Sequence, residues 1–310
     1  MKLVVMIPAF NEEASLPSLL PRVSKMLEPF TEVEVLVVDD GSTDATAAVA
    51  SALGATVLRL PIHRGLAAAF TAGLEEALRR GADVVVNLDA DGQYDPEEIP
   101  RLVEPILAGR ADMVLGDRGV GTLAHFSPTK RLLQRLGAWA VRQISGVPVT
   151  DATTGFRAFS RRCAAHLSCF TTFTYTLESL IQAGLSGMAV VSVPATAHPV
   201  ARPSRLFRSN ARYVAISMAT MARLVLLYRP LRVLLALASV GGLAGLALFL
   251  RFGYFYITGH SPAGHVQSLI VGAVLLLASL QLSLLAVIAD LVAVNRKLLD
   301  EIRAREREKK

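Results

Sequence analysis

Two long segments without a charged residue, both in the last third of the chain, most restrict what it can fold into. Residues 233–250 give 18 consecutive uncharged positions, and residues 261–289 give 29. At a rise of about 1.5 Å per residue, the longer segment exceeds the roughly 30 Å of a bilayer core, and the shorter one reaches it with a turn of flanking residues. The shorter segment has no polar stripe, which disfavours a core helix of a soluble domain. We predict a transmembrane hairpin over residues 231–295, with helices at about 231–250 and 266–294.

Positive charge flanks this hairpin on both sides. Residues 202–232 carry seven arginines, residues 296–310 carry seven lysines and arginines, and the connecting loop at 251–265 carries one arginine. The positive-inside rule therefore places both ends of the hairpin in the cytoplasm, with 296–310 as a basic cytosolic tail. No signal peptide precedes the first apolar run, so we expect the N-terminal domain in the cytosol as well.

The segment before the hairpin, residues 209–230, mixes apolar residues with Arg212 and Arg223 and contains no acidic residue. This pattern predicts an amphipathic helix lying in the membrane interface, where its arginines face an anionic lipid surface. An ordinary surface helix of the soluble domain is the alternative.

The net charge of +6 would suit a nucleic-acid-binding protein, but its distribution does not. Residues 1–200 carry 17 basic and 21 acidic residues, a net charge of −4, whereas residues 201–310 carry 15 basic and 5 acidic residues, a net charge of +10. The positive charge thus belongs to the most apolar part of the chain. We expect an anionic membrane as the partner of this region and no nucleic acid.

Residues 1–208 alternate short apolar runs with helical patterns, which predicts an α/β domain with a mostly parallel sheet and helices on both faces. Ligands of such sheets bind beyond the carboxyl ends of the strands. The predicted strands are 3–7, 33–38, 55–60, 83–88, 113–115 and 189–193, and the predicted helices are 12–27, 45–53, 66–80 and 97–108.

Acidic residues follow three of the predicted strands. Glu12 follows the first, Asp39 the second, and Asp89 and Asp91 the fourth. Because like charges repel, carboxylates converging on one sheet edge indicate a cation among them, and two of them one residue apart suit Mg²⁺ or Mn²⁺ that also binds phosphates. Neither a P-loop nor a Gly-x-Gly-x-x-Gly motif is present, so a nucleotide diphosphate would be held by metal and arginine.

These loops carry a family resemblance. Ile7-Pro8-Ala9-Phe10-Asn11-Glu12, Val38-Asp39-Asp40-Gly41-Ser42-Thr43-Asp44 and Asp89-Ala90-Asp91-Gly92-Gln93 resemble family 2 glycosyltransferases of the GT-A fold. Gly116-Asp117-Arg118, Asp151-Ala152-Thr153-Thr154-Gly155-Phe156-Arg157 and the basic stretch at Arg202 are similar to the polyprenyl-phosphate branch, which includes dolichol-phosphate mannose synthase and bacterial undecaprenyl-phosphate glycosyltransferases. The resemblance covers residues 3 to about 208, and the two-helix tail resembles that of bacterial members.

The resemblance implies a role for each matching residue. The metal ligands would be Asp89, Asp91 and Gln93, with Asp91 also counted as catalytic. The lipid phosphate would meet Arg118, Arg131 and Arg205, and catalysis would also involve Arg118, Arg131 and Arg202. The nucleotide would be bound by Pro8, Phe10, Glu12, Asp39, Asp40 and Ala90.

The resemblance further implies a nucleotide-diphosphate sugar as donor, polyprenyl phosphate as acceptor, the bacterial inner membrane as location and a homo-oligomer such as a tetramer. Two departures from the family pattern stand out. His63-Arg64-Gly65-Leu66-Ala67 replaces the usual Asn-x-Gly-x-Gly run, and Arg202-Pro203-Ser204-Arg205 replaces the usual Gly-x-Ser-Lys run.

The chemistry of the acceptor distinguishes the expected reaction from its alternatives. A phosphate monoester with a second pKa of about 6 is largely dianionic near neutral pH, so it can attack the anomeric carbon without a protein base and invert it. A lipid hydroxyl acceptor would need a general base, for which Glu178 is the candidate. A non-catalytic membrane scaffold with a degenerate domain is the third possibility, and the intact Asp89-Ala90-Asp91 motif argues against it.

Overall fold

The structure is a computed structural model of the 310-residue chain. It divides into two compact units, a first unit of Met1–Met221 with Asp300–Lys310 and a second unit of Ala222–Leu299. The residues that the structure describes are 1–23, 30–119, 139, 141–149, 151–169, 175–198, 218–219, 222–223, 225–258 and 266–308.

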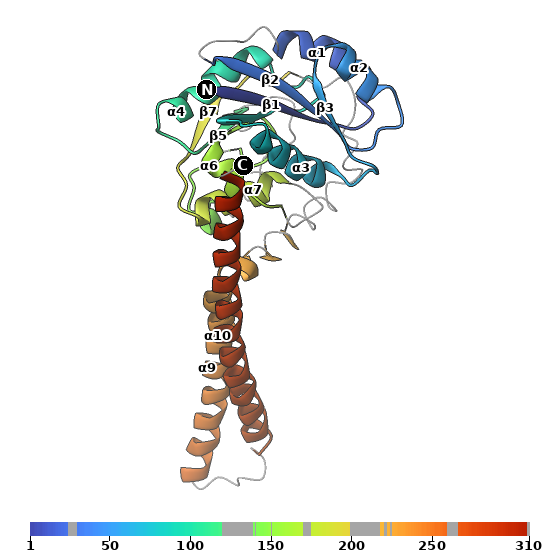
Figure 1. Ribbon diagram of the computed structural model, residues 1–310. Helices are drawn as coiled ribbons and strands as arrows, with labels where there is room; N and C mark the ends of the chain where they lie inside the picture. The colour runs from blue at the N-terminus through green and yellow to red at the C-terminus, as the bar shows by residue number, and fades with distance from the viewer. Residues whose placement is uncertain are drawn as a thin grey trace. The chain divides into compact units, whose positions relative to one another are not determined.

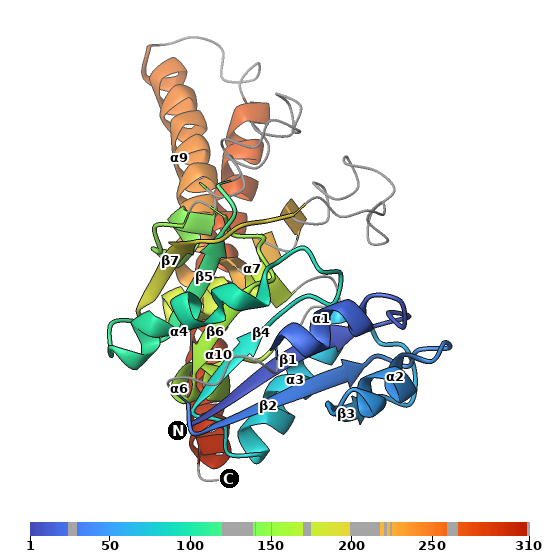
Figure 2. The same cartoon turned by 90° about the horizontal axis from the view of Figure 1, so that it is seen from above.

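A seven-stranded sheet forms the centre of the first unit, with the strand order β3-β2-β1-β4-β6-β5-β7 (Figure 2). Neighbouring strands run parallel except for β6, which is antiparallel to both β4 and β5. The mostly parallel α/β sheet predicted from the sequence is therefore confirmed. The strands are β1 (Lys2–Ala9), β2 (Glu32–Asp39), β3 (Thr56–Arg59), β4 (Val84–Asn87), β5 (Met113–Asp117), β6 (Arg157–Ser160) and β7 (Val190–Pro194).

Strand β6 is not predicted by the sequence pattern. Its four residues, Arg-Ala-Phe-Ser, contain no β-branched side chain and begin with an arginine that is fully buried. A charged residue inside the core is rare, so the apolar periodicity that marks the other strands is missing here.

Helices cover both faces of the sheet (Figure 1). On one face, Leu20 of α1 and Leu102 of α4 share a hydrophobic core with Val5 of β1. On the other face, α3 lies so close to β1 that a Cβ atom on Gly73 would fall 2.1 Å from Sδ of Met6. The helices of this unit are α1 (Leu16–Val23), α2 (Thr46–Ala52), α3 (Leu66–Arg79), the 3-10 turn η1 (Pro96–Glu98), α4 (Ile99–Leu107), α6 (Arg161–His166) and α7 (Tyr175–Leu185).

The register of the parallel strands brings their carboxyl ends to one edge. Ala9 at the end of β1 pairs with Asp39 at the end of β2, and Met6 pairs with Asn87 at the end of β4. The acidic loops after these three strands consequently begin at neighbouring positions, as expected for ligand-binding loops of an open α/β sheet.

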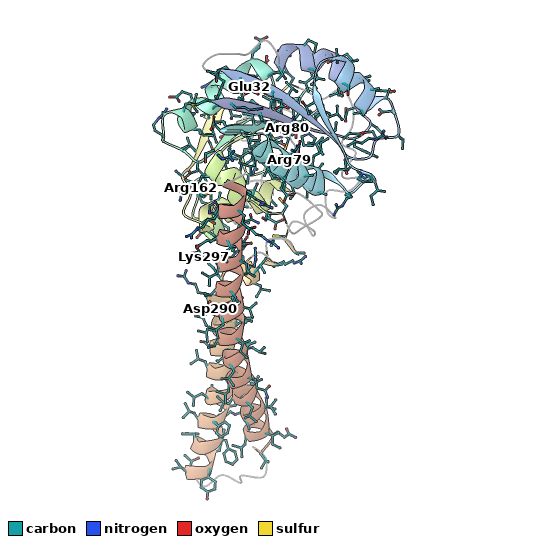
Figure 3. All side chains as sticks on the ribbon, in the orientation of Figure 1. Glu32, Arg79, Arg80, Arg162, Asp290 and Lys297 are labelled. Carbon is teal, nitrogen blue, oxygen red and sulfur yellow. The ribbon has the colours of Figure 1, made fainter. Side chains whose placement is uncertain are left out.

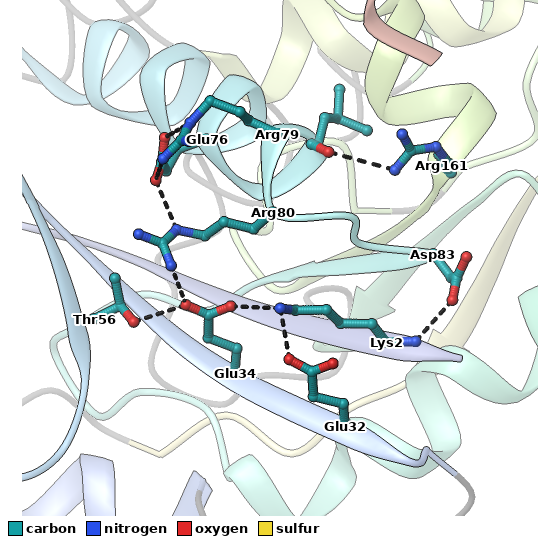
Figure 4. Close-up of polar contacts among 10 residues, drawn as sticks. Lys2, Glu32, Glu34, Thr56, Glu76, Arg79, Arg80, Asp83 and Arg161 are labelled. Carbon is teal, nitrogen blue, oxygen red and sulfur yellow. Dashed lines mark hydrogen bonds and ion pairs between the residues drawn. The ribbon is translucent and has the colours of Figure 1, made fainter. Parts of the chain in front are cut away.

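The opposite edge of the sheet carries a network of ion pairs (Figure 4). Lys2 Nζ lies 2.7 Å from Glu32 and 2.8 Å from Glu34, and Arg80 joins Glu34 at 2.7 Å to Glu76 at 2.6 Å. The network ties the starts of β1 and β2 to the end of α3. The network lies at the amino ends of the strands, so it does not occupy the carboxyl edge, where the acidic loops lie.

Two long apolar helices dominate the second unit, α9 (Pro230–Ile257) and most of α10 (Val266–Glu308). Both are long and apolar enough to cross a membrane, judged by length and composition. They pack at small residues: a Cβ atom on Gly245 would lie 2.9 Å from the Gly272 carbonyl oxygen, and one on Gly272 would lie 3.0 Å from that of Gly245. The two helices expected for the hairpin are thus present, and they pack closely.

Both helices extend beyond the predicted limits. α9 continues past 250 to Ile257, and α10 continues past 294 to Glu308, so the expected tail at 296–310 is largely helical. Charged residues return to α10 at Asp290 and Lys297, both labelled in Figure 3. They end the apolar stretch without ending the helix, because the tail is rich in strong helix formers and has no proline or glycine. The predicted interfacial helix at 209–230 falls largely outside the described residues.

Candidate active site

Two carboxylates follow β4, the strand at the centre of the carboxyl edge. Asp89 is only partly exposed and Asp91 lies two residues further along the same loop. Burial, together with the nearby charge of Asp91, raises the pKa of the Asp89 carboxyl to about 7. Two crowded carboxylates of which one resists ionisation are the expected surroundings of a divalent cation that would neutralise both.

The backbone of Gly155 forms the wall against which Asp89 packs. A Cβ atom at Gly155 would lie 2.1 Å from Asp89 Oδ2 and 2.5 Å from Oδ1, so only glycine leaves room for this carboxylate. The Gly155 carbonyl oxygen accepts hydrogen bonds from Asn87 Nδ2 at 2.7 Å and from the Tyr175 hydroxyl at 3.3 Å. The position of Asp89 is therefore set by a loop more than 60 residues away in sequence.

The loop after Asp91 is held by backbone contacts. The backbone N–H of Gln93 donates to Asp91 Oδ1 at 3.0 Å, and the Gln93 carbonyl oxygen accepts from the backbone N–H of His198 at 2.8 Å. Within the described part of the chain, no group of three or more His, Cys, Asp and Glu side chains is placed to hold a metal. A cation at Asp89 and Asp91 would thus keep coordination positions for Gln93, water and a diphosphate, a ligand set typical of Mg²⁺.

Asp39, at the end of β2, offers a buried hydrogen-bond acceptor. Its Oδ1 accepts from the backbone N–H of Ser42 at 2.9 Å. Its Oδ2 has no hydrogen-bond partner among the described residues, although Nε of Arg59 lies 3.4 Å away. An oxygen at this position is suited to a donor supplied by a ligand, such as an N–H of a base or a ribose hydroxyl.

Asp40 shapes the loop after β3. Its two carboxylate oxygens accept from the backbone N–H groups of Arg64 and Gly65, at 2.9 and 2.8 Å, and Oδ2 also lies 2.8 Å from His63 Nδ1. The predicted nucleotide contact of Asp40 would therefore act through the loop that it holds.

His63 completes this corner by stacking on Phe10, with ring centroids 3.9 Å apart and an angle of 25° between the planes. The loop of Phe10 is fixed by its neighbours: the backbone N–H of Glu12 donates to Thr46 Oγ1 at 2.8 Å, and Asn11 adopts a positive φ of 55°. Phe10, Glu12 and Asp39 thus lie on adjoining loops at one edge. Pro8 and Ala90 are buried beside them and supply backbone rather than polar side chains.

Arg118, just after β5, forms a two-pronged ion pair with Asp151. Arg118 Nε donates to Asp151 Oδ2 at 2.6 Å and Nη2 donates to Oδ1 at 3.0 Å, while Nη2 also reaches Thr153 Oγ1 at 2.8 Å. Burial by itself would raise the pKa of the Asp151 carboxyl, but the hydrogen bonds and charge of Arg118 outweigh it and hold that pKa below its usual value. The guanidinium of Arg118 is thereby fixed in direction.

The glycosyl transferase family 2 profile matches residues 4–167, which is more than half of the chain. The chain belongs to this family. Polyprenol monophosphomannose synthase of Mycolicibacterium smegmatis is 34% identical over 205 residues, covering 62% of this chain and 76% of that protein. The undecaprenyl-phosphate mannosyltransferase of Micrococcus luteus is 37% identical over 166 residues, covering 51% of this chain and 66% of that protein.

Solved structures show a similar fold. Glucosyl-3-phosphoglycerate synthase of Mycobacterium tuberculosis with phosphoglyceric acid is similar with a TM-score of 0.57 and 26% identity, over 71% of this chain and 79% of that chain. The same protein with Mn²⁺, UDP and glucosyl-3-phosphoglycerate gives a TM-score of 0.55 and 27% identity, over the same shares. The GT-A architecture expected from the sequence is confirmed.

For this family 2 glycosyltransferase, the structure describes some predicted site residues and not others. Arg131, Arg202 and Arg205 lie outside the described residues, so their roles stay predictions. Sequence reasoning gave no role to Asp151 or Arg157, although both stand in a quoted motif. The signal that would have found them is the presence of two charged residues, an acid and an arginine six positions apart, in a segment that is otherwise uncharged.

Proposed function

We propose that this protein is a membrane-bound, inverting glycosyltransferase that moves a sugar from a nucleotide-diphosphate sugar to polyprenyl phosphate at the cytosolic membrane face. The observation that carries the proposal is the juxtaposition at one sheet edge of the crowded carboxylates Asp89 and Asp91 with Asp39, whose Oδ2 has no hydrogen-bond partner among the described residues. The names of the two curated relatives, one a polyprenol monophosphomannose synthase and the other an undecaprenyl-phosphate mannosyltransferase, support the acceptor class.

On the donor side, Asp89, Asp91 and Gln93 would hold Mg²⁺ or Mn²⁺, which stabilises the charge of the departing diphosphate. The nucleoside would lie against Phe10 and Glu12, with Asp39 Oδ2 accepting a hydrogen bond from it. Asp40 would keep the 63–65 loop in place beneath it.

On the acceptor side, Arg118 would bind the lipid phosphate, joined by Arg131, Arg202 and Arg205. Asp151 and Thr153 hold Nε and Nη2 of Arg118, so the N–H groups of Nη1, which have no hydrogen-bond partner among the described residues, would be directed at a phosphate oxygen. A dianionic phosphate needs no base for its attack on the anomeric carbon, and in-line attack inverts that centre. An α-linked donor would then give a β-linked lipid-phosphate sugar.

The membrane placement follows from the same reaction. Polyprenyl phosphate stays in the bilayer, so α9 and α10 would keep the enzyme beside its substrate and raise the local acceptor concentration. We propose the bacterial inner membrane with the first unit cytosolic, the basic segments meeting anionic lipid, and assembly into a homo-oligomer such as a tetramer. We also propose the division into a catalytic domain (1–208), an interfacial helix (209–230), a hairpin (231–295) and a basic tail (296–310).

The test is transfer of radiolabelled sugar into the lipid phase. Membranes containing the protein and undecaprenyl phosphate are given UDP-glucose, UDP-N-acetylglucosamine or GDP-mannose, with and without a chelator of divalent metals. One donor is expected to label the lipid in a metal-dependent reaction. Asp91→Ala is expected to abolish labelling, whereas Asp83→Asn, an exposed acid at the other end of β4, is expected to leave it intact. Labelling at the wild-type rate by the Asp91→Ala variant contradicts the proposal.

A further inference from the structure

Arg157, the first residue of β6, is a charged residue buried in the core of the first unit. It has no exposed surface, and its burial lowers the pKa of the guanidinium. Among the described residues, no carboxylate lies within the 4.0 Å of an ion pair with it. Burying a guanidinium without a paired acid costs several kcal/mol, so this placement needs hydrogen bonds that compensate for the lost water.

Those hydrogen bonds come almost entirely from backbone. Nε donates to the Thr154 carbonyl at 2.8 Å and Nη2 to the Ala152 carbonyl at 2.9 Å. Nη1 donates to the Thr176 carbonyl at 2.7 Å and to Ser179 Oγ at 2.9 Å. The planar fork of one arginine thus joins the loop 151–156 to the start of α7.

The loop that Arg157 holds touches both halves of the proposed active site. On the acceptor side, its first residues, Asp151 and Thr153, fix the guanidinium of Arg118. On the donor side, Gly155 forms the wall against Asp89. A shift of this loop would move both groups together, because Arg157 holds two of its carbonyls, those of Ala152 and Thr154, between the residues that contact Arg118 and the glycine that contacts Asp89.

The positive charge of Arg157 also affects the acidic residues of the candidate site. Arg157 lies near enough for its positive charge to attract the carboxylates of Asp89 and Asp151, and among the described residues it forms an ion pair with neither. A buried cation behind the loop therefore offsets part of the repulsion among the acids in front of it. Neutral side chains could fill the same volume, but none would supply both the charge and the fork.

We propose that Arg157 is a positioning residue that fixes the loop 151–156 and so couples the geometry of Arg118 on the acceptor side to that of Asp89 on the donor side. This role rests on the proposed function only for its kinetic consequences. The bracing of the loop and the effect on the metal site are properties of the protein alone.

Three variants separate the contribution of the charge of Arg157 from that of its hydrogen bonds. Arg157→Gln removes the charge and most of the hydrogen bonds of the guanidinium. Arg157→Lys keeps the charge but loses the planar set of donors. Ser179→Ala removes one of the four hydrogen bonds of Arg157 and keeps its three bonds to carbonyls, at the cost of the bond from Ser179 Oγ to the Tyr175 carbonyl. Arg161→Lys is the matched control, because Arg161 also donates to a backbone carbonyl, that of Ala82 at 2.9 Å, but at the opposite edge of the sheet. Each full-length variant is compared in detergent with the parent.

The measurements are hydrogen exchange of the loop 151–156, Mn²⁺ binding followed by electron paramagnetic resonance, and the KM for undecaprenyl phosphate with kcat. Arg157→Gln is expected to speed exchange, to weaken Mn²⁺ binding and to lower kcat/KM for the acceptor, each by about 10- to 100-fold. Arg157→Lys is expected to retain Mn²⁺ binding within about threefold and still lose acceptor kcat/KM. Ser179→Ala is expected to show smaller changes of the same sign in exchange and kcat/KM.

Faster exchange in the loop with unchanged Mn²⁺ binding and unchanged kcat/KM would overturn the proposal, since Arg157 would then be a structural residue only. If Arg157→Gln is too unstable to measure, Ser179→Ala still tests the proposal, because this variant keeps the charge of Arg157 and most of its hydrogen bonds. If the parent protein transfers no sugar to undecaprenyl phosphate, the proposed function fails, whereas exchange and Mn²⁺ binding still decide the role of Arg157.

Discussion

The burial of Asp89 is unfavourable for folding, and the role proposed for this residue is metal binding. Burial and Asp91 raise its folded-state pKa to about 7, above the value of about 3.9 in an unfolded chain. A raised carboxyl pKa means that the folded state binds the proton more tightly. The metal-free protein therefore loses stability as the pH rises from about 4 through 7.

We predict that Asp89→Asn stabilises the metal-free protein at pH 8 by roughly 1–3 kcal/mol and changes little at pH 4. Thermal unfolding in EDTA at the two pH values measures the difference. Added Mn²⁺ is expected to stabilise the parent and not the variant. Equal stability of the two proteins at pH 8 would mean that the Asp89 carboxylate is ionised there at no cost.

The pH dependence of stability that Asp151 causes has the opposite sign to that of Asp89. Its folded-state pKa is lowered by Arg118, so its contribution is present above the unfolded pKa of about 3.9 and is lost as the pH falls through the lower folded pKa. We predict that Asp151→Asn costs about 3 kcal/mol at pH 7, because it leaves a largely buried arginine without its acid, and that the deficit shrinks below pH 4. Unfolding measured from pH 3 to 7 tests this, and a deficit independent of pH would contradict it.

At the scale of elements, the close contact of α9 and α10 depends on two glycines. The Cβ position of Gly245 lies 2.9 Å from a backbone oxygen of α10, which no side-chain rotation can relieve. We predict that Gly245→Leu separates the helices and lowers the thermal stability of the protein in bicelles. Gly253→Leu is the matched control on the same helix, because a Cβ atom there meets nothing within 4 Å. If both variants melt like the parent, the contact contributes little.

Arg307 lies near the end of α10, in the part of that helix that belongs to the first unit. Arg307 Nη1 donates to the carbonyls of Ala165 and Leu167, at 3.3 and 3.1 Å, at the C-terminal end of α6, and Nη2 contacts Glu75 of α3. A cation at the end of a helix satisfies carbonyls that lack intrahelical partners.

We predict that Arg307→Ala lowers the free energy of unfolding of the first unit by about 1–2 kcal/mol, because these carbonyls and Glu75 lose their partner. Arg305→Ala, an exposed neighbour on the same helix, is expected to have an effect within about 0.5 kcal/mol. Denaturant unfolding monitored by hydrogen exchange in α6 distinguishes the two. Equal effects of both variants would indicate that only the net charge of the tail matters.

At the scale of the whole molecule, charge and hydropathy divide the chain in the same place. Net charge is −4 over residues 1–200 and +10 over residues 201–310, and the apolar helices lie in the second of these. We predict that binding to vesicles increases with their content of anionic lipid and weakens with added salt, whereas DNA does not compete. Flotation with neutral and anionic vesicles measures this. Binding that is insensitive to lipid charge would remove the proposed role of the arginines.

Site residues that are placed by local sequence patterns can be predicted, whereas residues that are placed by contacts between distant parts of the chain cannot. Asp39, Asp89 and Asp91 are visible in the sequence because each directly follows an apolar strand, and the parallel strands bring those ends together. The pairing of Arg118 with Asp151 spans 33 residues. The carbonyls that bind Arg157 precede it and follow it in the sequence. Neither set of contacts produces a periodic pattern in the sequence. The short antiparallel strand β6 was missed for the same reason.

Periodicity and composition are enough to specify the parallel α/β domain, the acidic carboxyl edge and the two apolar helices, because they record which surfaces must be buried. The confinement of Asp89 by Gly155, the hold of Asp40 on the 63–65 loop and the burial of Arg157 emerge only in the folded molecule. These features depend on distances between residues far apart in the chain. Hydrophobic burial specifies which elements form, whereas the hydrogen bonds of buried charges specify where each functional group points.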